Sequence, residues 1–265
     1  MSLKKNNDMR AKLLLSPMLE DAEAKLHNNP EDPEAWYGYA IALGKNDQFE
    51  QSIDAFSQGL VRFPFNPLLY FGRGRKNIAS KCYWRALADL TMAIRLDPEV
   101  YSFWYYRAVV NNLSQNYVEA ITDFYHAIQQ TEPFERYGLI DWLFVTHVEM
   151  GDMKGARAVL DEIPDNLKPP KMHYAYYRRV HMYKGLLKPE DLVDRADIEA
   201  HCVSQENRVE LEISTLLFGL YIYYIYLGDQ QKANDALYQL LEHPYPGAFS
   251  TVKGEAAARA RGLIK

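Results

Sequence analysis

Residues 67–100 read PLLYFGRGRKNIASKCYWRALADLTMAIRLDPEV, and residues 101–134 read YSFWYYRAVVNNLSQNYVEAITDFYHAIQQTEPF. Aligned end to end, these two 34-residue segments share eight identities: Arg73/Arg107, Asn77/Asn111, Ser80/Ser114, Tyr83/Tyr117, Ala86/Ala120, Asp89/Asp123, Ala93/Ala127 and Ile94/Ile128. Unrelated segments of ordinary composition would share roughly two. The stretch is therefore an internal repeat, and it decides the fold.

A third copy precedes these two at 33–66. Each copy opens with a segment that carries a large ring, followed four residues later by a small residue. The rings are Trp36, Tyr70 and Trp104, and the small residues are Ala40, Gly74 and Ala108. Positions four apart share one face of a helix, so the small residue admits a neighbouring helix beside the ring. This pattern predicts a first helix in every copy.

The second half of each copy predicts another helix. Ala86, Leu90 and Ala93 form a small–large–small stripe at helical spacing, and the stripe recurs 34 residues later. Prolines at 64, 98 and 133 follow these segments, where proline cannot continue a helix. One such hairpin has too little core to be stable alone, so we expect neighbouring hairpins to stack.

The 34-residue spacing resembles that of the tetratricopeptide repeat (TPR) family. The resemblance implies an all-α, right-handed superhelical solenoid of TPR and TPR-like helix hairpins in a single domain, 1–265. Its expected parts are an N-terminal helical cap (1–32), three TPR repeats (33–66, 67–100, 101–134), degenerate helices (135–207), a TPR-like pair (208–243) and a capping helix (244–265).

The C-terminal half is similar to that of NlpI-like bacterial lipoproteins, which are TPR adaptors. The likeness lies in the order of a degenerate pair, a Tyr-rich helix at about 171–184 that ends at Gly185, a short helix opening at Pro189, and a pair joined by Leu227-Gly228-Asp229. Those lipoproteins begin with a signal peptide and a lipid-bearing cysteine, which residues 1–8 lack. We therefore expect a cytoplasmic protein. The alternative is an extracytoplasmic lipoprotein whose signal peptide has been removed.

The composition argues against several classes of function. Thirty basic and 35 acidic side chains give a net charge of −5, which argues against nucleic-acid binding. Two cysteines are too few for a disulfide framework. The apolar run at 216–227 has 12 residues, and we expect it to be too short to span a membrane. It is expected to form a buried central helix, with a homodimer interface as the alternative.

No motif predicts catalysis, a metal or a cofactor. Gly72-Arg-Gly74 lacks the third glycine of a dinucleotide loop, and His147-Val-Glu149 lacks the Cys-x-x-Cys of a deaminase. Asp123 with His126, and His201 with Cys202, could take part in chemistry, but each pair is explained more simply as a surface or helix-end pair. We expect a non-enzymatic protein. A metal- or phosphate-handling enzyme is the rival hypothesis.

Arg73 with Asp89 and Arg107 with Asp123 occupy equivalent repeat positions. In the TPR family such residues tend to pair across packed helices, so we expect structural ion pairs that fix the register of the repeats. The alternative is a charge ladder that binds a ligand. A partly buried charge needs a partner, because an unpaired one is costly.

The resemblance also implies a ligand-binding concave face formed by the first helices. The corresponding residues are Tyr37, Ile41, Lys45, Phe71, Arg75, Ala79, Tyr105, Val109 and Leu113. This set suits a segment with apolar anchors and one acidic group near Arg75. A TPR clamp for chaperone tails is not expected, because its Lys and Asn positions are occupied by other types: Tyr37, Ile41, Gly72, Ser102 and Tyr106.

The sequence thus predicts a protein- or peptide-binding scaffold or adaptor of unidentified partner. The alternative is a structural homo-oligomer whose groove is filled by its own terminal helix or by a second subunit.

Overall fold

The computed structural model describes residues 17–167, 174–201, 208–245 and 247–265. Every regular element within these ranges is a helix, so the expected all-α stack of hairpins is confirmed. The chain divides into two compact units, one ending at Ser114 (unit 1) and the other beginning at Gln115 (unit 2). The expectation of one continuous domain stays a prediction.

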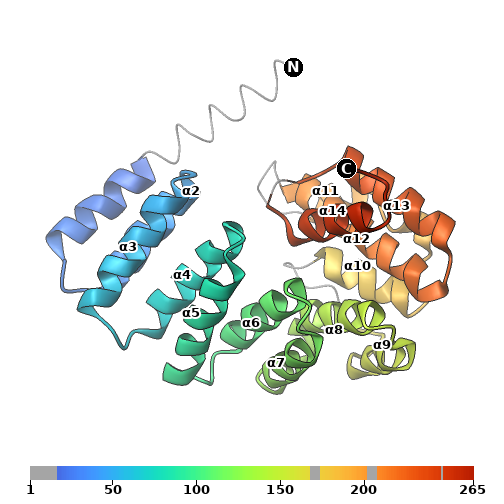
Figure 1. The fold of residues 1–265 in the computed structure, drawn as a ribbon, viewed down its shortest axis with the longest axis horizontal. Helices are drawn as coiled ribbons and strands as arrows, with labels where there is room; N and C mark the ends of the chain where they lie inside the picture. The colour runs from blue at the N-terminus through green and yellow to red at the C-terminus, as the bar shows by residue number, and fades with distance from the viewer. Residues whose placement is uncertain (1–16, 168–173, 202–207, 246) are drawn as a thin grey trace, which may run out of the picture. The chain divides into compact units, whose positions relative to one another are not determined.

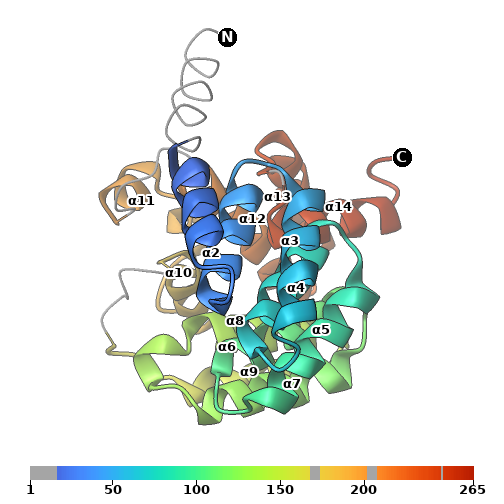
Figure 2. The same cartoon turned by 90° about the vertical axis from the view of Figure 1, so that its left-hand side faces the viewer.

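Unit 1 is a succession of antiparallel helices (Figures 1 and 2). After a helical segment at 17–28 come α2 (Pro33–Lys45), α3 (Phe49–Arg62), α4 (Pro67–Ala79), α5 (Tyr83–Leu96) and α6 (Tyr101–Leu113). Each helix packs against the next, and the first helices α2, α4 and α6 also touch in order. These contacts place the expected binding residues on neighbouring helices. Ser16, expected to cap the first helix, lies outside the described residues.

Two first helices of unit 1, α2 and α4, begin at proline with a side-chain cap before it, whereas α6 begins at Tyr101 after Val100 and has no such cap. The Asp32 carboxylate accepts a hydrogen bond from the Glu34 amide at 2.9 Å, and Asn66 accepts one from the Leu69 amide at 3.1 Å. These caps satisfy amides that have no partner within the helix. The ring residues add a repeated contact, because the Trp36 indole donates to the Pro30 carbonyl and the Trp104 indole to the Pro98 carbonyl.

The turns between paired helices share one backbone conformation. Asp47, Lys81 and Gln115 all have positive φ, at 60°, 57° and 63°, and they are spaced 34 residues apart. The hairpins of unit 2 use glycine for the same purpose, at Gly151 and Gly228. This periodicity of the backbone follows the periodicity of the sequence. The residues at 47, 81 and 115 are not glycine, so each holds a backbone conformation that glycine adopts more readily.

Unit 2 contains the remaining helices. They are α7 (Tyr117–Gln129), η1 (Pro133–Glu135), α8 (Tyr137–Glu149), α9 (Met153–Val159), η2 (Leu160–Glu162), α10 (Tyr174–Tyr183), η3 (Pro189–Asp191), α11 (Arg195–His201), α12 (Arg208–Leu227), α13 (Gln230–Glu242) and α14 (Phe249–Ala260). The expected helix at Pro189 is a single 3-10 turn, and α11 was not expected. The first residues of the expected Tyr-rich helix, 171–173, lie outside the described ranges.

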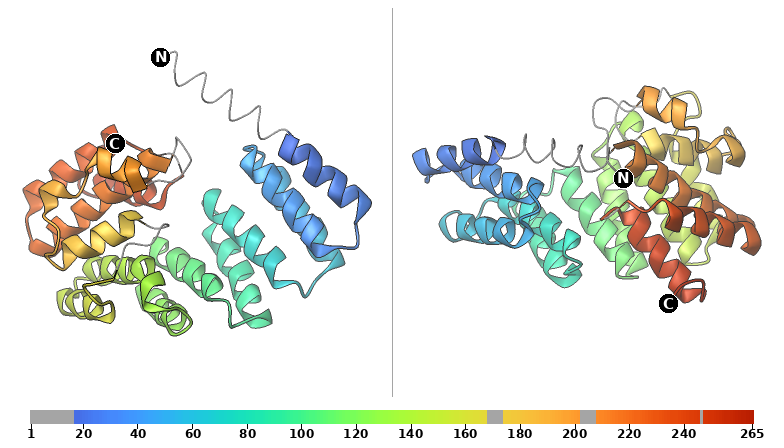
Figure 3. Two further views of the ribbon diagram at one scale, coloured as in Figure 1. Left: turned by 180° about the vertical axis from the view of Figure 1, so that it is seen from behind. Right: turned by 90° about the horizontal axis from the view of Figure 1, so that it is seen from above.

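Helix α12 is the centre of unit 2. It packs against α8, α10, α11, α13 and α14, and Figure 3 shows the C-terminal helices around it. The expectation that its apolar segment is too short to span a membrane was wrong on length, because residues 209–227 are long and apolar enough to do so. Half of that window is buried against other helices, as in a core helix.

Candidate functional site

The candidate site is on the first helices of unit 1. Six side chains on α2, α4 and α6 define it as the cationic–aromatic surface: Tyr37, Ile41, Lys45, Arg75, Lys76 and Tyr105. Tyr37, Ile41 and Tyr105 are half-buried, whereas Lys45 and Arg75 are exposed. Half-buried rings beside exposed cations can offer both apolar contact and charge to a ligand.

Neighbouring side chains largely cover two of the predicted residues. Phe71 is 7% exposed and Val109 is fully buried. They therefore support the surface from beneath. Leu113, the last residue of α6, remains half-buried.

Aromatic contacts hold the surface together. The Phe71 ring lies 4.8 Å from the Phe103 ring and 5.4 Å from the Tyr106 ring, measured between centroids. Tyr105 and Tyr106 meet edge to face at 5.2 Å. The two Phe71 contacts, one tilted and one edge-on, join α4 to α6. They give the half-buried Tyr105 ring a rigid support.

Arg75 lies over two of these rings. Its guanidinium carbon is 5.5 Å from the centre of Phe71 and 4.9 Å from that of Tyr106. Such cation–π contacts position a guanidinium without neutralising its charge. Arg75 is therefore fixed in place yet able to pair with an anion.

Lys76 is a second fixed cation, and the predicted set omitted it. Its ammonium lies 5.9 Å from the centre of the Phe49 ring. Burial lowers the pKa of Lys76, and the charges of Arg75 and Lys45 lower that pKa further. Arg75 and Lys45 are thus close enough to Lys76 to repel its charge. The basic run at 73–76 was the signal in the sequence, but a run does not show which side chains converge.

None of these three cations pairs with a carboxylate within the part of the chain that the structure describes. Neighbouring charges of one sign without counter-charges create a local potential that attracts anions. The cationic–aromatic surface is thus suited to a ligand with an acidic group, although the whole chain carries a net charge of −5.

The expected ion pair of Arg73 and Asp89 is present between α4 and α5. Arg73 Nε donates to Asp89 Oδ2 at 3.0 Å, and Nη2 donates to Oδ1 at 2.7 Å. Asn77 also donates to Asp89, at 3.1 Å. In the next repeat Arg107 donates to Thr91 Oγ1 at 3.2 Å, and its pairing with Asp123 stays a prediction. The Arg73 and Asp89 charges satisfy each other and are not available to a ligand.

The side chains considered for chemistry lie elsewhere. His147 Nδ1 is 2.9 Å from Asp152 Oδ2, and Asp152 also accepts from the Gly155 amide. That amide, and next the His147 side chain, hold the pKa of Asp152 below its usual value. Asp123 is buried and His126 is exposed, while Cys202 lies outside the described residues. Within the described ranges, no group of three His, Cys, Asp or Glu could hold a metal ion.

Residues 19–67 and 83–135 match the family model described as Tetratricopeptide repeat. These two segments are similar to tetratricopeptide repeats. Among curated proteins the chain is similar to serine/threonine-protein phosphatase T of Aspergillus oryzae, at 28% identity over 95 residues, and to serine/threonine-protein phosphatase 5 of Homo sapiens, at 29% over 92 residues. These matches cover 36% and 35% of the chain but only 20% and 18% of the phosphatases.

Solved structures show the same TPR fold. A tetratricopeptide repeat protein from Parabacteroides merdae aligns with a TM-score of 0.59 and 13% identity, covering 92% of each chain. The APC/C hetero-tetramer Cut9-Hcn1 gives 0.55 and 14%, covering 87% of this chain and 46% of that one. YrrB, described as a TPR protein with an unusual peptide-binding site, gives 0.51 and 13%, covering 90% and 99%. At these identities the likeness concerns the fold alone.

Proposed function

We propose that this chain is a non-enzymatic scaffold that binds a protein or peptide segment through the cationic–aromatic surface of α2, α4 and α6. The observation that carries the proposal is the group of three cations without carboxylate partners, Lys45, Arg75 and Lys76, beside the half-buried rings of Tyr37 and Tyr105. The described fold of TPR hairpins supports a binding role, because stacked repeats present extended surfaces to partners.

The chemistry of the surface defines the ligand class. Two tyrosine rings and Ile41 can receive apolar side chains, and the cations can receive an Asp or Glu carboxylate. The ring contacts under Arg75 fix its position before binding. Because less side-chain freedom is then lost on association, a pre-ordered surface gains affinity. The segment we propose therefore combines apolar anchors with an acidic residue.

Similarity to other repeat proteins agrees with this role. YrrB is described as having a peptide-binding site, and Cut9 is described in an assembly with Hcn1. The more specific adaptor role suggested by the NlpI-like resemblance, and a cytoplasmic location, are further proposals. Fractionation of cells that express the native gene tests the location, since a membrane-bound or exported form would contradict it.

Selection from a displayed peptide library tests the proposed function. We expect the wild-type chain to enrich peptides in which an acidic residue lies near apolar ones. A triple variant, Tyr37→Ala, Arg75→Gln and Tyr105→Ala, should lose at least about tenfold in affinity for those peptides. Arg85→Gln is the matched control, because Arg85 is an exposed arginine of α5 that stacks on Trp84 outside the surface.

Two outcomes would overturn the proposal. One is an enriched peptide set that binds the wild type and a folded triple variant equally. The other is a stable oligomer in which this surface is covered by a second copy, as in the homo-oligomer alternative. Light scattering during size-exclusion chromatography, repeated over a range of concentrations, separates a monomer from that oligomer.

Lys76 provides an independent readout. A carboxylate bound among the cations should raise the pKa of Lys76, because a nearby negative charge favours the charged ammonium. NMR titration of lysine labelled with ¹³C at Cε, with and without a selected peptide, measures the shift. An unchanged Lys76 pKa in the complex would place the acidic group elsewhere.

A further inference from the structure

A cavity lies in unit 2. It has a volume of about 570 Å³ and is bounded by η3, α11, α12 and α13. Ile213, Leu217 and Leu220 of α12 form an apolar floor and are 3–9% exposed, while Tyr224, Gln239 and His243 add polar groups to the lining. Val193 and Glu190 form part of one wall. The volume lies within the range of about 300–1,000 Å³ typical of ligand pockets.

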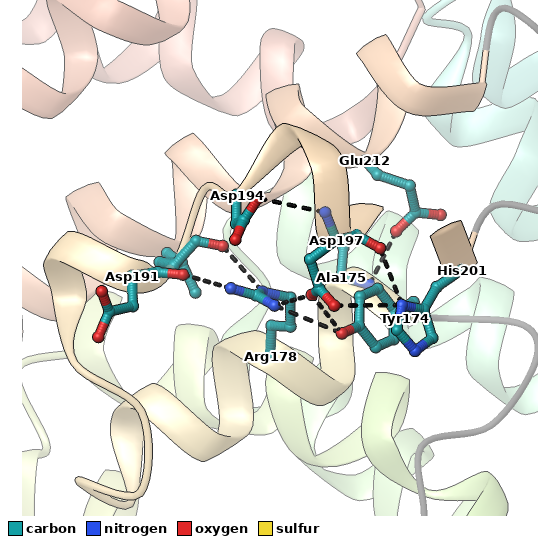
Figure 4. A network of polar contacts seen from close by, with 9 residues as sticks. Tyr174, Ala175, Arg178, Asp191, Asp194, Asp197, His201 and Glu212 are labelled. Carbon is teal, nitrogen blue, oxygen red and sulfur yellow. Dashed lines mark hydrogen bonds and ion pairs between the residues drawn. The ribbon is translucent and has the colours of Figure 1, made fainter. Parts of the chain in front are cut away.

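A buried arginine fixes that wall. Arg178 of α10, 7% exposed, donates through Nε to the Leu192 carbonyl at 2.9 Å. Its other nitrogens reach the Asp191 carbonyl, the Asp197 carboxylate and the Tyr174 hydroxyl. Figure 4 shows this guanidinium between the chain around Asp191 and Asp197. One buried side chain thus connects both η3 and α11 to α10, and the cavity is formed before any ligand binds.

A second contact joins α11, which forms part of the wall, to α12, which forms the floor. Arg195 of α11 pairs with Glu210 of α12 at 2.8 Å and with Glu199 at 3.6 Å. Arg195 lines the cavity, but two carboxylates balance its single charge. The charge of Arg195 is therefore already balanced and adds no net attraction for an anion.

Glu190 is the carboxylate among the residues that line the cavity. Its side chain is exposed, lines the cavity and forms no ion pair within the described ranges. An apolar floor under an unmatched carboxylate is complementary to a segment that carries apolar side chains and a cation. This preference is opposite in sign to that of the cationic–aromatic surface.

We propose that the cavity of unit 2 binds a protein segment that inserts apolar side chains over Ile213, Leu217 and Leu220 and pairs a Lys or Arg with Glu190. The proposal goes beyond the function proposed above, because it concerns another unit and another ligand charge. Under both proposals the chain contacts one acidic and one basic segment through separate surfaces.

The probes for the test are two fluorescein-labelled amphipathic peptides with leucines at helical spacing, one with lysines on the polar face and one with glutamines in their place. Fluorescence anisotropy should show that the full chain binds the lysine peptide about tenfold more tightly. Methyl NMR should place the shifts at Ile213, Leu217 and Leu220. Glu190→Lys should remove the preference for lysine, and because Glu190 is exposed this variant should remain folded.

Glu119→Lys is the matched control. Glu119 is an exposed carboxylate of α7 outside the cavity, and its reversal changes the net charge by the same amount. We expect this variant to bind like the wild type. Equal losses in both variants would show a non-specific effect of net charge and would overturn the proposal. Methyl shifts outside the cavity, or no binding of either peptide, would overturn it as well.

Discussion

Gly219 is the residue at which packing most clearly opposes helix propensity. It lies in the middle of α12, and a Cβ added there would come within 2.4–2.7 Å of the Arg179 side chain. Arg179 is 3% exposed and cannot easily move, because its Nε lies 2.9 Å from Asp141 Oδ1 and 3.1 Å from the Tyr183 hydroxyl. Glycine at 219 therefore makes room for a buried cation.

Gly219→Ala should destabilise the chain by about 1–3 kcal/mol through overpacking. Helix propensity alone predicts that the substitution stabilises the chain, since alanine in a helix is favoured over glycine by about 1 kcal/mol. Urea denaturation followed by circular dichroism measures the difference.

Gly38→Ala is the control for that substitution. Gly38 is exposed in α2, and no atom lies within 4 Å of a Cβ placed there. We expect this variant to gain up to about 1 kcal/mol. A Gly219→Ala variant as stable as Gly38→Ala would mean that Arg179 does not occupy the described position.

At the scale of the helical elements, the hairpin turns offer a further test. Lys81 holds φ at 57° between α4 and α5, in a conformation that costs L-residues about 1–2 kcal/mol. Lys81→Gly should therefore increase the free energy of unfolding, by up to about 1 kcal/mol after the greater freedom of glycine in the unfolded chain is subtracted. A Lys76→Gly substitution within α4 should instead be destabilising. Loss of stability in Lys81→Gly would contradict the turn geometry.

The contact between α8 and α10 makes stability depend on pH. Burial raises the pKa of Asp141 from 3.8 to about 7, although Arg179 opposes this shift. The folded chain then keeps a proton that the unfolded chain loses in this range. Asp141 therefore stabilises the fold most at low pH, and its contribution falls as pH rises from about 4 to about 7. Asp141→Asn should remove this contribution to the pH dependence of the free energy of unfolding, whether or not the substitution also changes stability at a single pH.

Urea denaturation of both chains at several pH values between about 4 and about 8 measures this slope. Their difference in unfolding free energy isolates the Asp141 contribution from that of the other carboxylates. If the difference is the same at all these pH values, Asp141 does not titrate as described.

Most helices could be predicted from the sequence because their signals are local. Ring and small residues four apart mark α2, α4 and α6, and Gly228-Asp229 marks the α12–α13 turn, where Asp229 caps α13. Helix α11 could not be predicted, because its seven residues show no clear periodicity and the helix is held through Asp197 by Arg178, 19 residues earlier in the chain.

The candidate site was predictable only in part. Repeat positions identified Tyr37, Arg75 and Tyr105, but the same rule included Phe71 and Val109, which tertiary packing buries. Lys76 was missed because its approach to Arg75 and Lys45 depends on how α2 packs against α4. The cavity beside Glu190 gave no sequence signal, since its residues come from four separate elements.

For the whole molecule, the local distribution of charge is a better guide to its ligands than the net charge is. The chain is acidic overall, yet unit 1 presents three unmatched cations and unit 2 presents an unmatched carboxylate at a cavity with an apolar floor. We infer a scaffold with two surfaces of opposite preference. The central claim is that the cations of unit 1 recognise an acidic residue of the partner.

A double-mutant cycle tests that claim most directly. Titration calorimetry would compare the wild type and Arg75→Gln, each with a selected peptide and with the same peptide carrying Gln in place of its acidic residue. A direct pairing predicts a coupling energy of about 0.5–3 kcal/mol between the two changes. A coupling energy of zero, with both single changes additive, would contradict the account.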